Sequence, residues 1–203
     1  MPPKPKFTRE EITAAALKIV TEKGLEALTS RELGAALGSS ARPIFTVFKN
    51  MDELLTEIRG AAMRLFEAHV KKAEGFYPVF KQVGLQMVSF AEEEPKLFRL
   101  LFMSENTTHM TFDDMFDYMG GTAELCVDAI QHDYGLEWEA ARLLFRHCWI
   151  YTYGICALIA SKVCGFTDKE VSDMLSREFL STLALIKSGN SDIYSITPQK
   201  LSD

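Results

Sequence analysis

Apolar residues recur every three or four positions along most of the chain, which is the spacing of one face of an α-helix. In residues 8–23 this pattern includes Ile12 and Ile19, and Gly24 ends it. The same spacing predicts a helix over residues 51–74. No segment alternates apolar and polar residues as a half-buried strand would. The pattern therefore predicts an all-α protein, with further helices over residues 77–94, 95–103, 112–133, 137–163 and 168–187.

Residues 28–55 predict two short helices joined by a tight turn, with a third helix directly after them. Thr29 and Glu32 have the spacing of a capping box, and Gly38 offers the left-handed residue that ends a helix sharply. Ser40 is placed to cap the second short helix. A short helix held behind a turn by another short helix is the shape that enters a DNA major groove. The segment is therefore predicted to be a helix-turn-helix.

A recognisable pattern of residues runs through this segment and the helix before it, in Thr8–Ile12, Lys23–Leu25, Leu28–Leu33, Ile44–Phe45, Phe48–Asn50 and Asp52–Leu55. In these residues the chain resembles the TetR-type transcriptional repressors. The resemblance implies a three-helix DNA-binding domain, a larger helical ligand-binding domain, and a homodimer that reads a palindromic operator. Phe45 stands where the family commonly has a Tyr that donates to a phosphate, and Val47 replaces a Tyr or His that often does likewise.

DNA contacts are expected from the turn and from the second short helix. Basic side chains and the free N–H groups at capped helix starts would bind phosphates, and the outward face of the second helix would meet base edges. Arg42 is the residue best placed to read a guanine. The expected DNA-binding residues are Thr29, Arg31, Ser40, Ala41, Arg42, Phe45, Thr46 and Lys49.

Charge is distributed unevenly, with the basic residues favoured at the N-terminal end. Residues 1–50 hold eight Lys or Arg against five Glu, a net +3, so the rest of a chain with net charge −6 carries −9. A basic end on an acidic body allows local contact with phosphates. We expect residues 1–52 to form a basic arm and the DNA-binding domain. Residues 53–203 would form the ligand-binding and dimerisation domain, with 53–74 as a connecting helix and 189–203 as a flexible tail.

A homodimer is expected through the last two long helices. Small residues at helical spacing would allow close approach of one helix, and an apolar ridge would cover the other. The alternative is that both are core helices of a monomer. The expected dimer residues are Gly154, Ala157 and Ser161 on the first helix and Leu175, Phe179 and Leu183 on the second.

The second domain is rich in Met and aromatic residues, which suit a pocket for a small hydrophobic molecule. The alternative is that these side chains are simply core. The expected ligand-binding residues are Phe90, Phe98, Phe102, Met103, Met119, Phe145, Trp149 and Tyr153.

Other functions find little support in the sequence. Catalytic and nucleotide-binding motifs are absent, and the four histidines lack metal-ligand spacing, so we expect no enzyme, cofactor or metal site. The segment His147–Ser161 is too short for a membrane span, and no targeting signal opens the chain, which favours a cytoplasmic protein. The four cysteines would be reduced and mostly buried, although Cys156 and Cys164 leave a redox role open. Two rival functions remain, a small-molecule or lipid-binding protein with a degenerate DNA-binding module, and a dimerisation or adaptor module.

Overall fold

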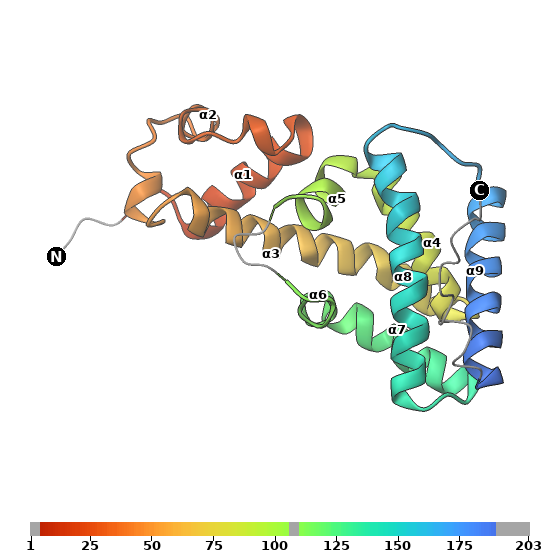
Figure 1. Ribbon diagram of the computed structural model, residues 1–203. Coiled ribbons are helices and arrows are strands. Elements are labelled where there is room, and N and C mark those ends of the chain that lie inside the picture. Colours follow the sequence, from red (N-terminus) through yellow and green to blue (C-terminus); the bar gives the residue numbers. More distant parts are fainter. Residues whose placement is uncertain (1–4, 106–109, 190–203) are drawn as a thin grey trace, which may run out of the picture.

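The computed structural model describes residues 5–105 and 110–189, and over these residues the protein is helical with no strand (Figure 1). This agrees with the predicted all-α class. Three short 3₁₀ turns, η1 (Leu25–Ala27), η2 (Ile44–Thr46) and η3 (Lys71–Gly75), join the longer elements. The α-helices are α1 (Arg9–Lys23), α2 (Ser30–Ala36), α3 (Met51–Val70), α4 (Val79–Glu93), α5 (Pro95–Phe102), α6 (Phe112–Met119), α7 (Gly121–Tyr134), α8 (Trp138–Ala160) and α9 (Asp168–Ser188).

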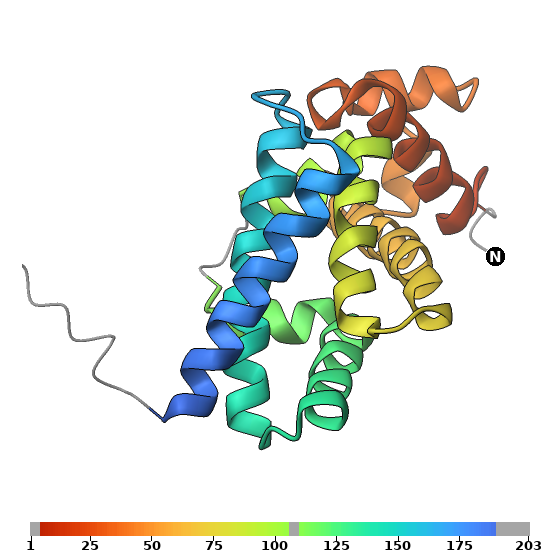
Figure 2. The same ribbon diagram turned by 90° about the vertical axis from the view of Figure 1, so that its right-hand side faces the viewer.

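Helix α3 joins two parts of the molecule. Its first turns pack against α1 at one end of the protein, where α1, α2 and η2 gather. Its later turns run between α4, α5 and α7 (Figure 1). Helices α4, α7, α8 and α9 then form a bundle, in which α8 and α9 lie side by side (Figure 2). One long helix therefore extends from the N-terminal module into the C-terminal bundle.

Several helix starts have a side-chain cap. Thr8 caps α1 in a full capping box with Glu11, and Thr167 does the same for α9 with Glu170. Thr29 caps α2 by accepting from the Glu32 N–H, but the predicted capping box is only half formed. The Glu32 carboxylate instead forms an ion pair with Lys23 at 2.5 Å, because the end of α1 brings that ammonium group close.

Two helix predictions need correction. The second short helix of the predicted helix-turn-helix is only the 3₁₀ turn η2, which begins after Pro43 and has no side-chain cap, so Ser40 does not cap it. Residues 112–133 do not form one helix, because the chain turns at Gly120, where φ is +49°, and divides into α6 and α7. The predicted tail falls almost entirely on residues 190–203, outside the described part of the chain.

Helix α8 is long and apolar enough to cross a membrane by length and composition. Core helices of soluble proteins meet the same test, and α8 packs against α4, α7 and α9. Buried residues recur along it, including Leu144, Cys148 and Ile155. It is therefore the central helix of the C-terminal bundle.

Candidate nucleic-acid interface and ligand cavity

The turn after α2 is held tightly against that helix. Gly38 adopts a left-handed conformation with φ +62°, and the Ser39 N–H donates to the Gly34 carbonyl oxygen at 2.8 Å. A Cβ atom on Gly34 would lie 2.8 Å from the carbonyl carbon of Ser40 and 2.9 Å from the Ala41 nitrogen. Residue 34 must therefore be glycine for the turn to pack in this way.

Two buried residues anchor the segment after the turn. Ile44 and Phe48 lie four residues apart, and both are almost fully buried. The Thr46 hydroxyl donates to the Pro43 carbonyl oxygen at 2.7 Å, which closes the 3₁₀ turn on its outer side. The segment is short, but it has a defined inner face and a defined outer face.

Arg9 fixes this segment to α3. Its guanidinium group forms ion pairs with Glu53 at 2.7 Å and Glu57 at 2.9 Å, and it donates to the Val47 carbonyl oxygen at 3.4 Å. The same group lies 4.3 Å from the centre of the Phe48 ring. The pKa of the Glu53 carboxyl is lowered, first by the hydrogen bond from the Lys49 N–H and then by Arg9. Glu53 is therefore a carboxylate that accepts a hydrogen bond from the Lys49 N–H of this segment and forms an ion pair with Arg9 of α1.

The outer face of the module combines basic and apolar groups. Ion pairs engage Lys18 with Glu22 and Lys23 with Glu32. Within the described residues, no ion pair engages the exposed side chains of Arg31, Arg42 and Lys49, so their charges remain available to a polyanion. Of the expected DNA-binding residues, Ala41 is half-buried, and Thr29, Arg31, Ser40, Arg42, Phe45, Thr46 and Lys49 are exposed.

A cavity of about 210 Å³ lies in the C-terminal bundle between α4, α7, α8 and α9. Aromatic side chains from all four helices line it, and Tyr151 and Leu180 are exposed residues of its wall. Sequence reasoning missed most of this wall, because the residues come from four helices that are distant in sequence. Its aromatic members are Phe80, Tyr134, Phe145, Trp149, Tyr151 and Phe179.

Only two of the eight expected ligand-binding residues, Phe145 and Trp149, line this cavity. Met103 is exposed at the end of α5. Tyr153 donates to the Phe102 carbonyl oxygen at 3.3 Å and stacks on Trp149 with 5.4 Å between ring centres. The remaining four expected ligand-binding residues are buried in the hydrophobic core, which was the alternative role for these side chains. These core residues are Phe90, Phe98, Phe102 and Met119.

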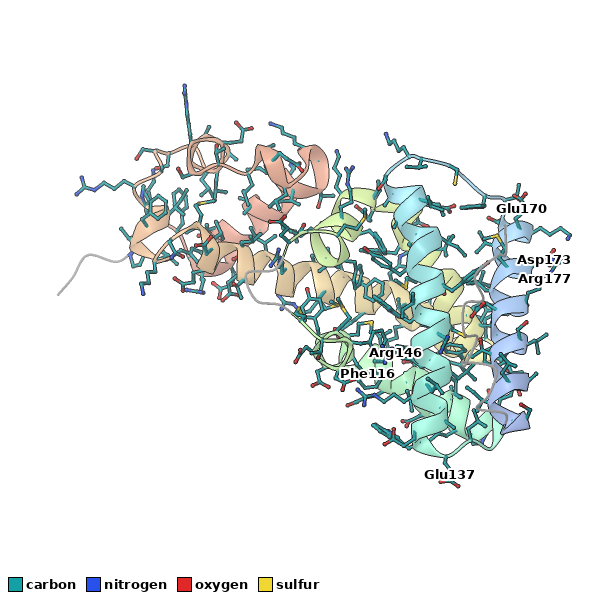
Figure 3. The ribbon with its side chains drawn as sticks, in the orientation of Figure 1. Phe116, Glu137, Arg146, Glu170, Asp173 and Arg177 are labelled. Carbon is teal, nitrogen blue, oxygen red and sulfur yellow. The ribbon has the colours of Figure 1, made fainter. Side chains whose placement is uncertain are left out.

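The expected dimer residues of α9 lie on its face toward the protomer's own bundle. Leu175 and Phe179 line the cavity, and Leu183 is buried within the protomer. Helix α9 packs against α4 and α8. Residues of its other face, such as Asp173 and Arg177, point outward (Figure 3). On α8, Gly154 and Ser161 are exposed and Ala157 is half-buried.

One carboxylate lines the cavity. Glu178 accepts a hydrogen bond from the Thr182 hydroxyl at 3.1 Å. It also lies close to the Cys148 thiol, whose pKa is raised to about 12 by burial and then by the Glu178 charge. Thr152, also in the wall, donates to the Cys148 carbonyl oxygen, so its hydroxyl proton is already used. Glu178 and Lys81 are therefore the charged residues of a largely apolar wall.

Three of the four cysteines are buried and held as thiols. Burial raises the pKa of Cys126 and Cys156 far above the usual range, and Cys148 follows the same rule. Cys164 is exposed in the connection between α8 and α9. No group of three or more His, Cys, Asp or Glu in residues 5–105 and 110–189 could hold a metal ion.

A chain of contacts joins the cavity to the N-terminal module. Trp149 in the cavity wall stacks on Tyr153, which hydrogen-bonds the last residue of α5. At the other end of α5, the Lys96 ammonium group donates to the Glu22 carbonyl oxygen near the end of α1. Helix α5 therefore contacts α8 next to the cavity wall at one end, and it contacts α1, the helix that carries Arg9, at the other end.

Comparison with known proteins agrees with this geometry. Residues 12–58 match the family model described as bacterial regulatory proteins, tetR family. No match was found among curated proteins.

Three solved structures share the fold at low sequence identity. A TetR variant from Acinetobacter baumannii AYE in complex with minocycline is 20% identical, with a TM-score of 0.59 over 92% of this chain and 99% of the other. The multidrug binding protein EbrR complexed with imidazole is 16% identical, with a TM-score of 0.56 over 87% and 95% of the two chains. A TetR family member from Streptomyces coelicolor A3 is 15% identical, with a TM-score of 0.56 over 84% and 96%. Residues 12–58 therefore match the tetR family of bacterial regulatory proteins, and the chain as a whole shares the fold of these three structures.

Proposed function

We propose that this protein is a cytoplasmic transcriptional repressor that binds a palindromic operator as a homodimer and is released by a small hydrophobic ligand. The observation that carries the proposal is the contact chain from the cavity wall to α1, through Trp149, Tyr153, α5 and Lys96. A ligand in the cavity could act on the DNA-binding module through these contacts. Two structures of the same fold contain minocycline and imidazole, which supports a ligand site in this fold.

Release of DNA requires that the ligand prefer one arrangement of the module over another. A ligand with equal affinity for both arrangements would shift nothing, however tightly it bound. Phe145 and Trp149 line the cavity on α8, the helix that contacts α5 through Tyr153. A ligand that moves this part of α8 would change the position of α5 and, through Lys96, the end of α1.

The dimer would form through the outward faces of α8 and α9. Ile150 and Leu180 are 50% and 61% exposed, and Leu143 and Leu158 lie on the same outward side of α8. A soluble protein seldom leaves so many apolar side chains of two adjacent helices in water. Two copies would place their helix-turn-helix modules about 34–36 Å apart, or at a multiple of that distance, to read two half-sites.

One observation favours the second candidate, a ligand-binding protein with a degenerate DNA-binding module. The segment that would enter the major groove contains only the 3₁₀ turn η2. Phe45 and Val47 also lack the hydroxyl or imidazole groups that the family resemblance leads one to expect. Against it, Arg31, Arg42 and Lys49 remain exposed beside that turn.

Selection of genomic fragments by the purified full chain at near-physiological salt tests the proposal. We expect enrichment of one palindrome and a steep fall of its affinity with rising salt, because phosphate contacts release counterions. Lys71→Ala, at the exposed far end of α3, is the control for a lost positive charge and should retain the same palindrome. Failure to enrich any sequence, from a protein that is folded and dimeric, would favour the second candidate.

A further inference from the structure

The walls of the cavity form a continuous aromatic surface. The Phe80 ring of α4 lies 5.6 Å from Phe179 of α9 and 6.4 Å from Phe145 of α8, between ring centres. Tyr134 of α7 lies 4.8 Å from Phe179. Aromatic faces carry partial negative charge, and several of them around one space attract a positive group. This surface is therefore suited to a cation as well as to a neutral apolar molecule.

Glu178 gives the cavity a formal negative charge. Its carboxylate lines the aromatic cavity and accepts from Thr182, and no Lys or Arg of the described residues forms an ion pair with it. A carboxylate that is partly removed from water beside an apolar wall is stabilised by a positive partner. The Thr182 hydroxyl donates a hydrogen bond to Glu178 but carries no positive charge, so among the described residues the negative charge of Glu178 has no ion-pair partner.

Lys81 is the positive group that lines the same cavity, and it must be weighed against Glu178. Its charge acts on Asp173, whose pKa is lowered first by the hydrogen bond from Lys169 and further by Arg177 and Lys81. Asp173 points outward from α9 (Figure 3), so Lys81 faces a carboxylate on the outer side. The Glu178 charge instead acts on the buried thiol of Cys148. The Glu178 charge therefore lies beside the buried wall at Cys148, and the Lys81 charge lies beside the outward carboxylate of Asp173.

We propose that the cavity binds a small organic cation, a substituted ammonium compound with apolar groups, whose charge lies between Glu178 and the aromatic walls. The inference rests on the proposed function only in taking this cavity as the ligand site. It narrows the expected ligand from hydrophobic molecules in general to those with one positive charge. A cavity of about 210 Å³ suits a compact cation.

Three probes of one shape and different charge test this class. Benzyltrimethylammonium is the cation, neopentylbenzene is its neutral carbon isostere, and benzylsulfonate is an anion with a similar tetrahedral head. Binding to the unmodified full chain is measured by calorimetry or by the change in tryptophan fluorescence. We expect the cation to bind at least about tenfold more tightly than the neutral isostere, and the anion to bind weakest.

Glu178→Gln removes the charge and keeps the acceptor for Thr182. It should weaken binding of benzyltrimethylammonium at least about tenfold and change binding of neopentylbenzene less than about twofold. Glu137→Gln makes the same charge change at the exposed start of α8 and should alter neither (Figure 3). Thermal unfolding of each variant shows whether it is folded, and the comparison of probes on the unmodified chain does not depend on any variant.

The outcomes separate this inference from the proposed function. Equal or tighter binding of neopentylbenzene, or no binding of any of the three probes, overturns the cation proposal and leaves operator binding to be judged by fragment selection. Cation binding that depends on Glu178, in a protein that enriches no DNA sequence, supports the cation site and contradicts the repressor.

Discussion

The hydroxyl group of Tyr153 donates a hydrogen bond to the carbonyl oxygen of Phe102 at 3.3 Å, and this bond joins the middle of α8 to the last residue of α5. Tyr153→Phe removes the bond and keeps the ring that stacks on Trp149. We expect the free energy of unfolding to fall by about 1 kcal/mol, as for one neutral hydrogen bond. Chemical denaturation measures this change, and Tyr77→Phe, at a side chain that is 76% exposed, should change it far less.

The tight turn after α2 gives a second prediction. Gly34→Ala places a Cβ atom 2.8 Å from the Ser40 backbone, which cannot yield as a flexible side chain would. We expect a loss of about 1–3 kcal/mol in stability, together with weaker DNA binding. Gly60→Ala on α3 is the matched control. Its Cβ atom would meet only the end of Arg64 at 3.7 Å, so the substitution should stabilise the helix by up to about 1 kcal/mol. Equal effects of the two changes in thermal unfolding would contradict the packing argument.

Arg42 is expected to read a base. Arg42→Ala should cost about 1–3 kcal/mol of specific binding and relax the preference at one operator position, if that residue contacts a guanine. Binding to a set of single-base operator variants measures both effects. An unchanged preference across the set would leave Arg42 as a phosphate contact only.

The proposed dimer surface predicts a change of oligomeric state. Ile150→Arg places a charge in the outward apolar face of α8, where a partner would have to bury it. We expect this variant to sediment as a monomer and to lose affinity for a palindrome more than for a half-site. Leu65→Arg makes the same kind of change at a residue of α3 that is 47% exposed and should remain dimeric. A dimeric Ile150 variant would place the interface elsewhere.

Acid should weaken the contact between α3 and α4 at His69. The Lys72 ammonium group can only donate to Nδ1, so the proton of the neutral ring is on Nε2, which donates to the Ser89 hydroxyl. Burial lowers the pKa of His69, and the Lys72 charge lowers it further. The unfolded chain therefore binds a proton at His69 more readily than the folded chain does. Protonation of His69 leaves the free energy of unfolding unchanged above the usual His pKa, and it lowers that free energy increasingly as the pH falls. Unfolding measured at several pH values should show a smaller loss on acidification in His69→Gln than in the unmodified chain.

The local signals in the sequence predicted the fold well where they act within one helix. Thr29 caps α2, and Gly38 adopts the left-handed conformation that ends it. These features depend on spacing along the chain, which the sequence displays directly. The 3₁₀ turn at η2 was not predicted, because a helical spacing of Ile44 and Phe48 is compatible with a much shorter turn.

The cavity was harder to predict because it depends on how helices turn toward one another. Helix α9 has apolar residues on more than one side, so its sequence does not show which side faces the bundle. Leu175 and Phe179 face inward, and Leu180 faces outward. Glu178 next to Phe179 resembled a surface residue of an amphipathic helix, and only the packing of α9 on α8 places it in the cavity wall.

The contrast between the exposed Cys164 and the three buried thiols has a practical consequence. A thiolate is the form that reacts with a maleimide, and burial keeps Cys126, Cys148 and Cys156 protonated at neutral pH. A single dye would thus attach to the loop between α8 and α9 of the native sequence, without any engineered cysteine. In a dimer, two such dyes would report the separation of the two loops by energy transfer, and any change in it on addition of ligand or DNA.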